Sequence, residues 1–247
     1  MAAAFRVKRV ALVARRVGGS SYSRRMKRLL LLLPLIALVG CSSSTPPSTL
    51  VALISHTAPV DDVASTHFCG GVLVAPDLVA TAAHCLTDRA PSSIDAIVGA
   101  DNLCSTAAIG GTRSAVTAFE PLDTSADIAL IRLASPSAVT PTTLATSVSE
   151  PVAWGWGTGS PGGVGPCSAR AVALTVTDEC VGAAAGSLDD YLCAVPTGEV
   201  NTCTGDSGGP VFVDGALLAI VSSGAGCGPD DSGYYTRASL LEPAIER

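Results

Sequence analysis

Lysine is missing from the whole of the chain beyond residue 40. Residues 1–40 hold nine Lys and Arg and no acidic residue, whereas residues 41–247 hold six Arg against all 21 Asp and Glu, a net charge of −15. A surface this acidic repels the phosphate backbone of DNA and RNA. The composition therefore argues against nucleic acid as a partner.

Metal-binding motifs are also scarce. The 247 residues include only three His, and the nine Cys contain no C-x-x-C pair. Structural zinc sites draw on closely spaced Cys and His, so we expect neither a metal nor a cofactor. Nine cysteines in a chain of this size indicate an oxidising compartment instead.

No apolar run is long enough to span a bilayer comfortably. The longest, Leu29–Val39, has eleven residues, against about 20 for a transmembrane helix. The basic segment Arg24–Arg28 precedes it, and this order is typical of a signal peptide. We assign residues 1–40 to a signal peptide with a basic lead, whose true start is Met1 or Met26.

The sequence L-V-G-C that ends at Cys41 resembles a bacterial lipobox, in which the signal peptide is cut before a cysteine that then carries diacylglycerol. Residues 41–49, rich in Ser and Pro, would form a lipidated tether, and three acyl chains exceed the two signals that stable anchoring needs. This implies the bacterial cell envelope, at the outer membrane or cell surface. The alternative is an ordinary signal peptide with an incidental Cys, and a secreted protein.

From residue 50 the chain consists of short apolar segments separated by Gly, Pro and Asp. Only Ser239–Glu246 has a helical pattern, so the sequence predicts an all-β fold, a barrel or a sandwich, with a short C-terminal helix. Ser135–Ser149 is poor in strand residues and is a plausible linker between two halves. The predicted strands are Leu50–Ser55, Gly71–Val74, Leu78–Ala80, Ile94–Val98, Ala115–Phe119, Ile128–Leu133, Val152–Trp154, Ala171–Val176, Tyr191–Ala194, Pro210–Val213 and Ala216–Ser222.

A glycine-rich segment holds the candidate nucleophile. Asn201–Val211 reads N-T-C-T-G-D-S-G-G-P-V, with Ser207 among three glycines. A serine hydroxyl needs a base beside it and hydrogen-bond donors for the oxyanion that forms, and glycines let successive backbone N–H groups point to one place. A structural turn between two strands is the alternative.

Two upstream motifs favour catalysis. His84 lies in T-A-A-H-C, and Asp127 begins D-I-A-L-I-R-L. With the Ser207 motif, in the order His, Asp, Ser, they resemble the trypsin/chymotrypsin family of serine proteases over roughly residues 50–247. The resemblance implies a serine endopeptidase with two six-stranded antiparallel β-barrels, at about residues 50–134 and 150–238, and protein or peptide substrates cleaved in the cleft between them.

The resemblance also implies a role for each site residue. His84 would be the general base, and Asp127 would hold the imidazole in the right tautomer. The oxyanion donors would be the N–H groups of Gly205 and Ser207. Ser222 would hydrogen-bond Asp127, and its strand would pair with substrate. Outside their motifs, a lone His or Asp is more often structural, and His56 and His67 are expected to be surface or packing residues.

Eight cysteines remain when Cys41 is set aside. The family's bridges imply three disulfides, and the two cysteines that match no family pair form the fourth by elimination. The four expected disulfides are Cys69–Cys85, Cys180–Cys193, Cys203–Cys227 and Cys104–Cys167.

The specificity pocket is expected to be uncharged. Asn201 occupies the floor position, where trypsins have Asp, and Gly224 and Gly233 match the small residues that keep the pocket walls open. We therefore expect cleavage after medium or large uncharged residues. Asp230 and Asp231, in the adjacent loop, could reach inward and change this.

Two departures from the family pattern stand out. Between Cys41 and the first strand there is no Ile-Val-Gly-Gly start, whose freed amine would pair with Asp206. Asp206 must find another partner, or the oxyanion loop is malformed, because an unpaired buried carboxylate is costly. Ser223 replaces the family's usual Trp, which removes an apolar wall for substrate.

The sequence thus predicts a monomeric, membrane-anchored serine endopeptidase. Two other functions remain open. One is an inactive homologue that keeps the fold as a binding or scaffold lipoprotein. The other is an envelope lipoprotein in which the Ser207 motif is incidental.

Overall fold

The computed structural model describes residues 45–59, 62–104, 110–181 and 187–246. The predicted signal peptide and Cys41 lie outside these ranges. Within them, no helix has the length and apolar character needed to cross a membrane.

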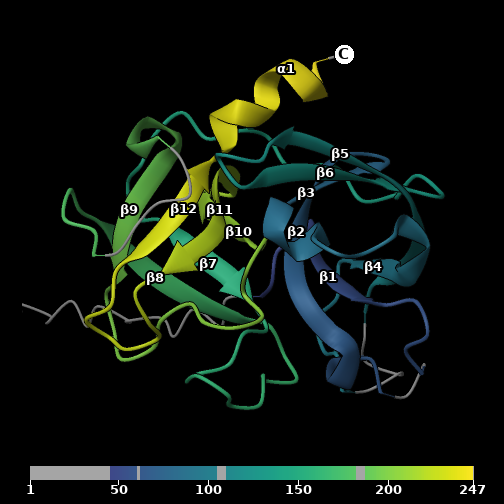
Figure 1. Ribbon diagram of the computed structural model, residues 1–247, viewed down its shortest axis with the longest axis horizontal. Helices are drawn as coiled ribbons and strands as arrows, with labels where there is room; N and C mark the ends of the chain where they lie inside the picture. The colour runs from purple at the N-terminus through teal and green to yellow at the C-terminus, as the bar shows by residue number, and fades with distance from the viewer. Residues whose placement is uncertain (1–44, 60–61, 105–109, 182–186, 247) are drawn as a thin grey trace, which may run out of the picture. The chain divides into compact units, whose positions relative to one another are not determined.

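Twelve antiparallel strands form two closed barrels of six strands each, which lie side by side (Figure 1). This is the chymotrypsin-like, all-β architecture expected from the sequence. The first barrel has the strand order β1-β2-β3-β6-β5-β4, and the second β10-β11-β12-β9-β8-β7. The strands of the first barrel are β1 (Leu50–Ser55), β2 (His67–Ala75), β3 (Leu78–Thr81), β4 (Ile94–Val98), β5 (Thr112–Asp123) and β6 (Ile128–Leu133). Those of the second are β7 (Val152–Gly155), β8 (Arg170–Val176), β9 (Tyr191–Pro196), β10 (Pro210–Val213), β11 (Ala216–Gly224) and β12 (Gly233–Arg237).

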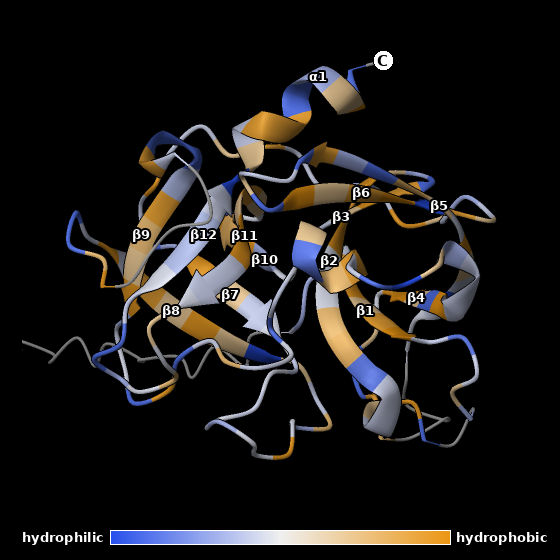
Figure 2. Ribbon diagram, in the orientation of Figure 1, coloured by the Kyte–Doolittle hydropathy of each residue, from blue (hydrophilic) through white to orange (hydrophobic). Residues whose placement is uncertain are grey.

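Three apolar clusters hold the barrels together. One fills the first barrel, around Leu53, Leu73 and Ile131. A second fills the second barrel, and a third joins the two barrels through side chains that include Trp156 and Ile220. In Figure 2, β6 is hydrophobic along most of its length, while β5 beside it is mixed, as expected for an antiparallel strand with one solvated face. The joining cluster fixes one barrel against the other, and the candidate site depends on residues from both.

One strand, β12, was not predicted from the sequence. β12 reads G-Y-Y-T-R and lacks an apolar run, yet Tyr234 and Tyr235 are buried and the strand pairs with both β11 and β9. Strands β2 and β5 are also longer than predicted. The C-terminal helix is shorter: a 3₁₀ turn covers Ala238–Leu241, and α1 spans only Glu242–Ile245.

Candidate active site

The pairing of β3 with β6 brings His84 and Asp127 together. These strands are antiparallel, with Thr81 at the end of β3 opposite Ala129 at the start of β6. His84 follows β3 in a 3₁₀ turn, and Asp127 directly precedes β6. Both side chains therefore leave the first barrel at the same end, although 43 residues separate them in the chain.

Asp127 accepts three hydrogen bonds at this end of the barrel. Its Oδ2 lies 2.8 Å from His84 Nδ1 and 2.6 Å from Ser222 Oγ, and its Oδ1 accepts the His84 backbone N–H at 2.9 Å. Burial alone would raise the pKa of Asp127, but the hydrogen bonds from His84 and Ser222 outweigh it and hold the pKa below its ordinary value. The group is thus a carboxylate at neutral pH, and it orients the imidazole through Nδ1.

The second barrel supports the turn that carries Asp127. Thr236 Oγ1 donates to the Ala126 carbonyl at 2.7 Å, and Tyr191 OH donates to the Ser125 carbonyl at 3.1 Å. Asp127 itself has φ 56°, in the left-handed region that Asp tolerates better than most residues. Contacts from both barrels therefore fix the position of the carboxylate.

Ser207 is held between the barrels by backbone bonds. Its carbonyl accepts the Gly70 N–H of β2 at 2.7 Å, and the Gly208 N–H donates to the Val221 carbonyl of β11 at 2.8 Å. Gly205 and Gly208 have φ of 99° and 78°. A Cβ on Gly208 would collide with the Gly70 carbonyl, so the turn requires glycine there.

One pocket of about 490 Å³ is lined by candidate residues of both barrels, including His84, Asn201, Gly205, Ser207 and Ser222. Asp127 lines a second pocket, together with His84 and Ser222. Among the hydrogen bonds of the described residues there is none from Ser207 Oγ to His84, whose Nε2 lies 3.8 Å from Cys85 Sγ. Catalytic hydrogen bonds are often long without substrate and tighten when it binds. In the same part of the chain, the N–H groups of Gly205 and Ser207 donate to no protein acceptor, so both can bind an oxyanion.

Comparisons with known proteins agree with this arrangement. The family model for trypsin matches residues 42–245. A trypsin from Saccharopolyspora erythraea is 34% identical over 188 residues, covering 69% of this chain and 82% of that protein. A trypsin from Squalus acanthias is 33% identical over 202 residues, covering 74% and 86%.

The chain belongs to the trypsin family. It is a serine endopeptidase, a hydrolase whose substrates are proteins or peptides. Among solved structures it is similar to neuropsin, a serine protease expressed in the limbic system of mouse brain, with a TM-score of 0.63 and 26% identity over 82% of this chain and 94% of that one. A mutant of human heparin binding protein has a TM-score of 0.65 and 22% identity over 81% and 90%, which supports the fold alone.

The trypsin-family fold carries four disulfides in the described residues. They join Cys69 to Cys85, Cys104 to Cys167, Cys180 to Cys193, and Cys203 to Cys227, the pairs expected from the sequence. Each closed loop is worth roughly 2–4 kcal/mol of stability. His84 lies close to both sulfurs of the first disulfide, but oxidised sulfurs are not thiolate ligands, so this group does not suit a metal.

Asn201, the residue expected at the pocket floor, lines the pocket with a fully engaged amide. Asn201 is 2% exposed, and its Nδ2 donates to the carbonyls of Gly228 and Asp231 at 2.9 and 2.8 Å, while its Oδ1 accepts the Thr202 N–H at 2.8 Å. Gly224 and Gly233 line the same pocket. The floor therefore offers an incoming side chain no charge and little spare hydrogen-bonding capacity.

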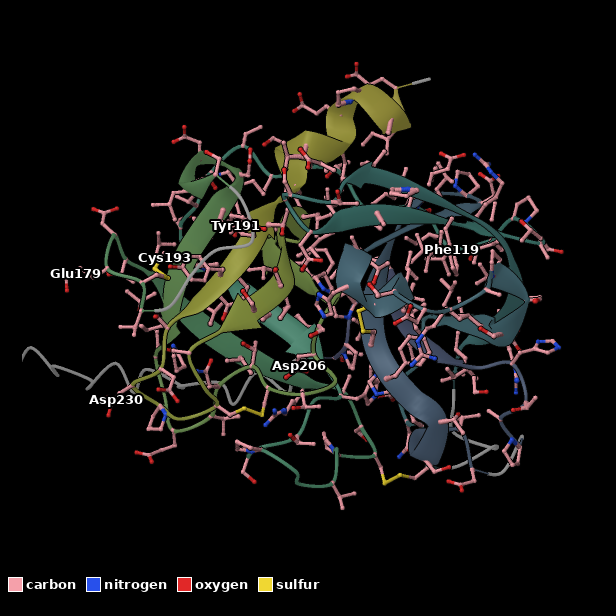
Figure 3. All side chains as sticks on the ribbon, viewed as in Figure 1. Phe119, Glu179, Tyr191, Cys193, Asp206 and Asp230 are labelled. Atoms are coloured by element: carbon pink, nitrogen blue, oxygen red, sulfur yellow. A yellow bond between two sulfur atoms is a disulfide. The ribbon has the colours of Figure 1, made fainter. Side chains whose placement is uncertain are left out.

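Neither acidic residue of the neighbouring loop lines this pocket. Asp230 is exposed and lies at the edge of the molecule in Figure 3. The Asp231 carboxylate accepts the Gly228 N–H at 2.7 Å and packs against Gly226, where it leaves no space for a Cβ. It therefore stabilises the turn outside the pocket lining.

The buried carboxylate of Asp206 has a partner that sequence reasoning missed. Arg170, the first residue of β8, places Nη2 3.4 Å from Asp206 Oδ2. Burial raises the pKa of Asp206, against the lowering effect of two backbone N–H bonds and of Arg170. The only signal in the sequence is that Arg170 is one of six arginines in an acidic segment, which does not single it out.

A second missed residue lies on the other side of the pocket. The Arg89 guanidinium stacks 3.7 Å above the Phe68 ring, and both residues line the pocket beside the Cys69–Cys85 disulfide. Arg89 is exposed, and such a cation–π contact favours this position of the guanidinium by roughly 0.5–1 kcal/mol. Arg89 thus places a positive charge at the pocket, although the chain beyond residue 40 is acidic as a whole.

His67 packs beside the oxyanion loop. Its ring meets Trp156 edge-on at 5.6 Å, and its buried Nε2 has no hydrogen-bond partner. Burial lowers the pKa of His67 to about 4, although a backbone hydrogen bond to Cys69 works the other way. Protonation of this ring is therefore costly in the folded protein.

Acid is expected to destabilise the protein through His67. The unfolded chain takes up this proton near pH 6.5 and the folded chain only near pH 4, so stability is full above pH 6.5 and falls as the pH drops toward 4. The loss amounts to about 3 kcal/mol. Urea unfolding at a series of pH values should show this loss in the wild type but not in His67→Phe. An equal dependence of the free energy of unfolding on pH in the two proteins would contradict it.

Proposed function

We propose that this endopeptidase hydrolyses peptide bonds through an acyl-enzyme on Ser207. His84 Nε2 takes the hydroxyl proton as Oγ attacks the substrate carbonyl carbon, and then gives that proton to the leaving amine as the C–N bond breaks. Water then loses a proton to His84 and attacks the ester, which releases the acid and restores Ser207. The hydrogen-bonded series Ser222, Asp127, His84 supports this mechanism, because His84 and Ser222 line one pocket with Ser207.

The oxyanion donors in this mechanism are the N–H groups of Gly205 and Ser207. Neither donates to a protein acceptor in the described residues, and both residues line the pocket. A donor placed where negative charge develops is worth roughly 2.7–4 kcal/mol in the transition state. Asp127 stabilises the imidazolium that forms meanwhile and does not itself accept the proton.

The enzyme is proposed to cleave after medium or large uncharged residues. A Lys or Arg side chain would have to lose its hydration over Asn201, whose amide is already engaged, without meeting a counter-ion. A Leu, Met, Phe or Tyr side chain would instead gain burial energy, roughly 1.5–3 kcal/mol.

Profiling on a peptide library tests this proposal. We expect kcat/KM for Leu, Met, Phe or Tyr before the cleaved bond to exceed that for Arg or Lys by roughly 10- to 200-fold. A dominant preference for Arg or Lys would show that the interpretation of Asn201 is wrong. Absence of cleavage of every peptide would instead count against the proposed mechanism.

The protein is further proposed to be exported and anchored to the bacterial cell envelope through lipid on Cys41. Four disulfides support an oxidising compartment. The lipobox-like sequence and the tether that follows it support the anchor.

Cys41→Ser is therefore expected to move the protein from the membrane fraction to the soluble fraction. The wild type should incorporate a palmitate analogue during growth and the variant should not, because the thiol is the acceptor. Cys41 belongs to none of the catalytic motifs, so peptide hydrolysis should be equal in the two. A wild-type protein that takes up no palmitate analogue would contradict the lipid anchor on Cys41, although the protein could still be exported.

A further inference from the structure

The carboxylate of Asp206 lies directly behind the proposed oxyanion donors. Asp206 is 2% exposed, and its side chain is enclosed by Gly155 and Gly157, where any Cβ would collide with the carboxylate. Its neighbours in the chain are Gly205 and Ser207, whose N–H groups would bind the oxyanion. The position of this carboxylate therefore sets the direction of both donors.

Three donors hold the carboxylate in place. The Gly157 N–H bonds Oδ1 at 2.7 Å, the Cys203 N–H bonds Oδ2 at 2.9 Å, and Arg170 Nη2 lies 3.4 Å from Oδ2. Arg170 is the one cation within ion-pairing distance of Asp206 among the described residues. A buried carboxylate without a cation costs several kcal/mol, so this contact decides whether the side chain stays inside.

Arg170 is itself fixed in position. Besides Asp206, its Nη2 donates to the carbonyl of Thr158 at 2.6 Å and to that of Asn201 at 3.3 Å. The pairing of Gly155 with Arg170 between β7 and β8 brings the arginine to this place. The guanidinium thus joins the β7–β8 edge, the pocket floor and the oxyanion loop.

In the family pattern, the cation that pairs with this aspartate is an amine freed by cleavage of the chain. Here a side chain of the second barrel supplies the charge, and it does so wherever the polypeptide begins. We propose that Arg170 is a positioning residue that holds Asp206, and with it the Gly205 and Ser207 N–H groups, so that the protease is active without a new amino terminus. This inference rests on the proposed role of the two N–H groups as oxyanion donors.

Blocking the amino terminus tests the inference on the native full chain. The two lysines, Lys8 and Lys27, lie in the predicted signal peptide, so acetic anhydride finds no side-chain amine in the protein from which residues 1–40 have been removed. We expect acetic anhydride to acetylate the α-amine of the folded protein, or lipid to have acylated it already. The rate of fluorophosphonate labelling should remain within about twofold, because the oxyanion donors keep their positions. An α-amine that is protected until the protein is unfolded, or labelling that is lost on acetylation, would overturn the proposal.

Variants of Arg170 test the positioning role separately. Arg170→Gln should slow fluorophosphonate labelling on the order of 100-fold, because the oxyanion donors lose their orientation. Arg170→Lys should recover most of this loss, since it restores the charge without the planar guanidinium. A merely structural role would not favour the charged replacement in this way.

Arg113→Gln is the matched control. Arg113 Nε forms an ion pair with Asp95 at 2.6 Å in the first barrel, away from the pocket, so its loss should leave labelling within about twofold. A folded Arg170→Gln variant that labels as fast as the wild type would overturn the proposal. A wild type that takes no label at all would instead count against the catalytic role of Ser207.

Discussion

Alanine at Ser207 or at His84 is expected to lower kcat for peptide hydrolysis on the order of 10⁶-fold, and alanine at both is expected to cost no more than either alone. The two side chains act as one unit: without the base the hydroxyl is a poor nucleophile, and without the hydroxyl the base has no proton to take. The remaining rate comes from binding and the oxyanion donors. Single-turnover kinetics on one peptide substrate, with all three variants, measures this.

His56→Ala provides the control for this double-mutant cycle. His56 is exposed and bonds Asp95 at 2.8 Å, outside the pocket, so the variant should retain wild-type kcat. Additive losses for Ser207 and His84 would mean that the two residues act independently. That result would contradict the proposed transfer of the proton between them.

Asp127→Asn is expected to lower kcat on the order of 10⁴-fold while the protein stays folded. Asp127 accepts hydrogen bonds from His84 Nδ1, the His84 backbone N–H and Ser222 Oγ, and it uses both carboxylate oxygens. The amide of Asn has only one oxygen, so it cannot accept all three. An NH₂ group facing Nδ1 would favour the tautomer that carries its proton on Nε2, which cannot then take the proton of Ser207. The pH dependence of kcat and intact disulfides in both proteins would separate this effect from unfolding.

Ser222→Ala is expected to weaken the orientation of His84 less than Asp127→Asn does. It removes one charge-assisted hydrogen bond of 2.6 Å and leaves the carboxylate, so we expect a loss of about tenfold in kcat. A larger loss in Ser222→Ala than in Asp127→Asn would contradict the orienting role of the carboxylate.

Local sequence was sufficient to predict much of the fold and the candidate site. His84, Asp127 and Ser207 each lie in a short motif at the end of a strand. The structure brings His84 and Ser207 to one pocket, and Asp127 hydrogen-bonds His84 from the neighbouring strand end. Eleven strands were predicted because each has an apolar run bounded by turn residues. The cysteine pairs followed from the family resemblance and from the even number that remained.

Contacts between distant strands could not be predicted in this way. Arg170 meets Asp206 only because β7 and β8 pair in one register, and no local pattern marks that register. The hydrogen bond from Ser222 to Asp127 was expected, but from the family resemblance and not from any local pattern. The β12 strand itself was missed because its buried residues are tyrosines and a threonine rather than aliphatic side chains.

The charge of the pocket was also uncertain until the loop was seen. Asp230 and Asp231 could have reached inward on sequence grounds, but neither lines the pocket. Whether a loop carboxylate faces a pocket depends on turn geometry, here the bond from Gly228 to Asp231. Composition alone does not encode that geometry.

Mapping the adduct of a fluorophosphonate probe by mass spectrometry tests the central claim most directly. The account predicts a single modified residue, Ser207, in the wild type, and no adduct in Ser207→Ala. The wild type should be checked for folding and for its four disulfides before the probe is added. A folded wild type that takes up no probe, as expected of an inactive homologue that serves as a binding or scaffold protein, would contradict the account.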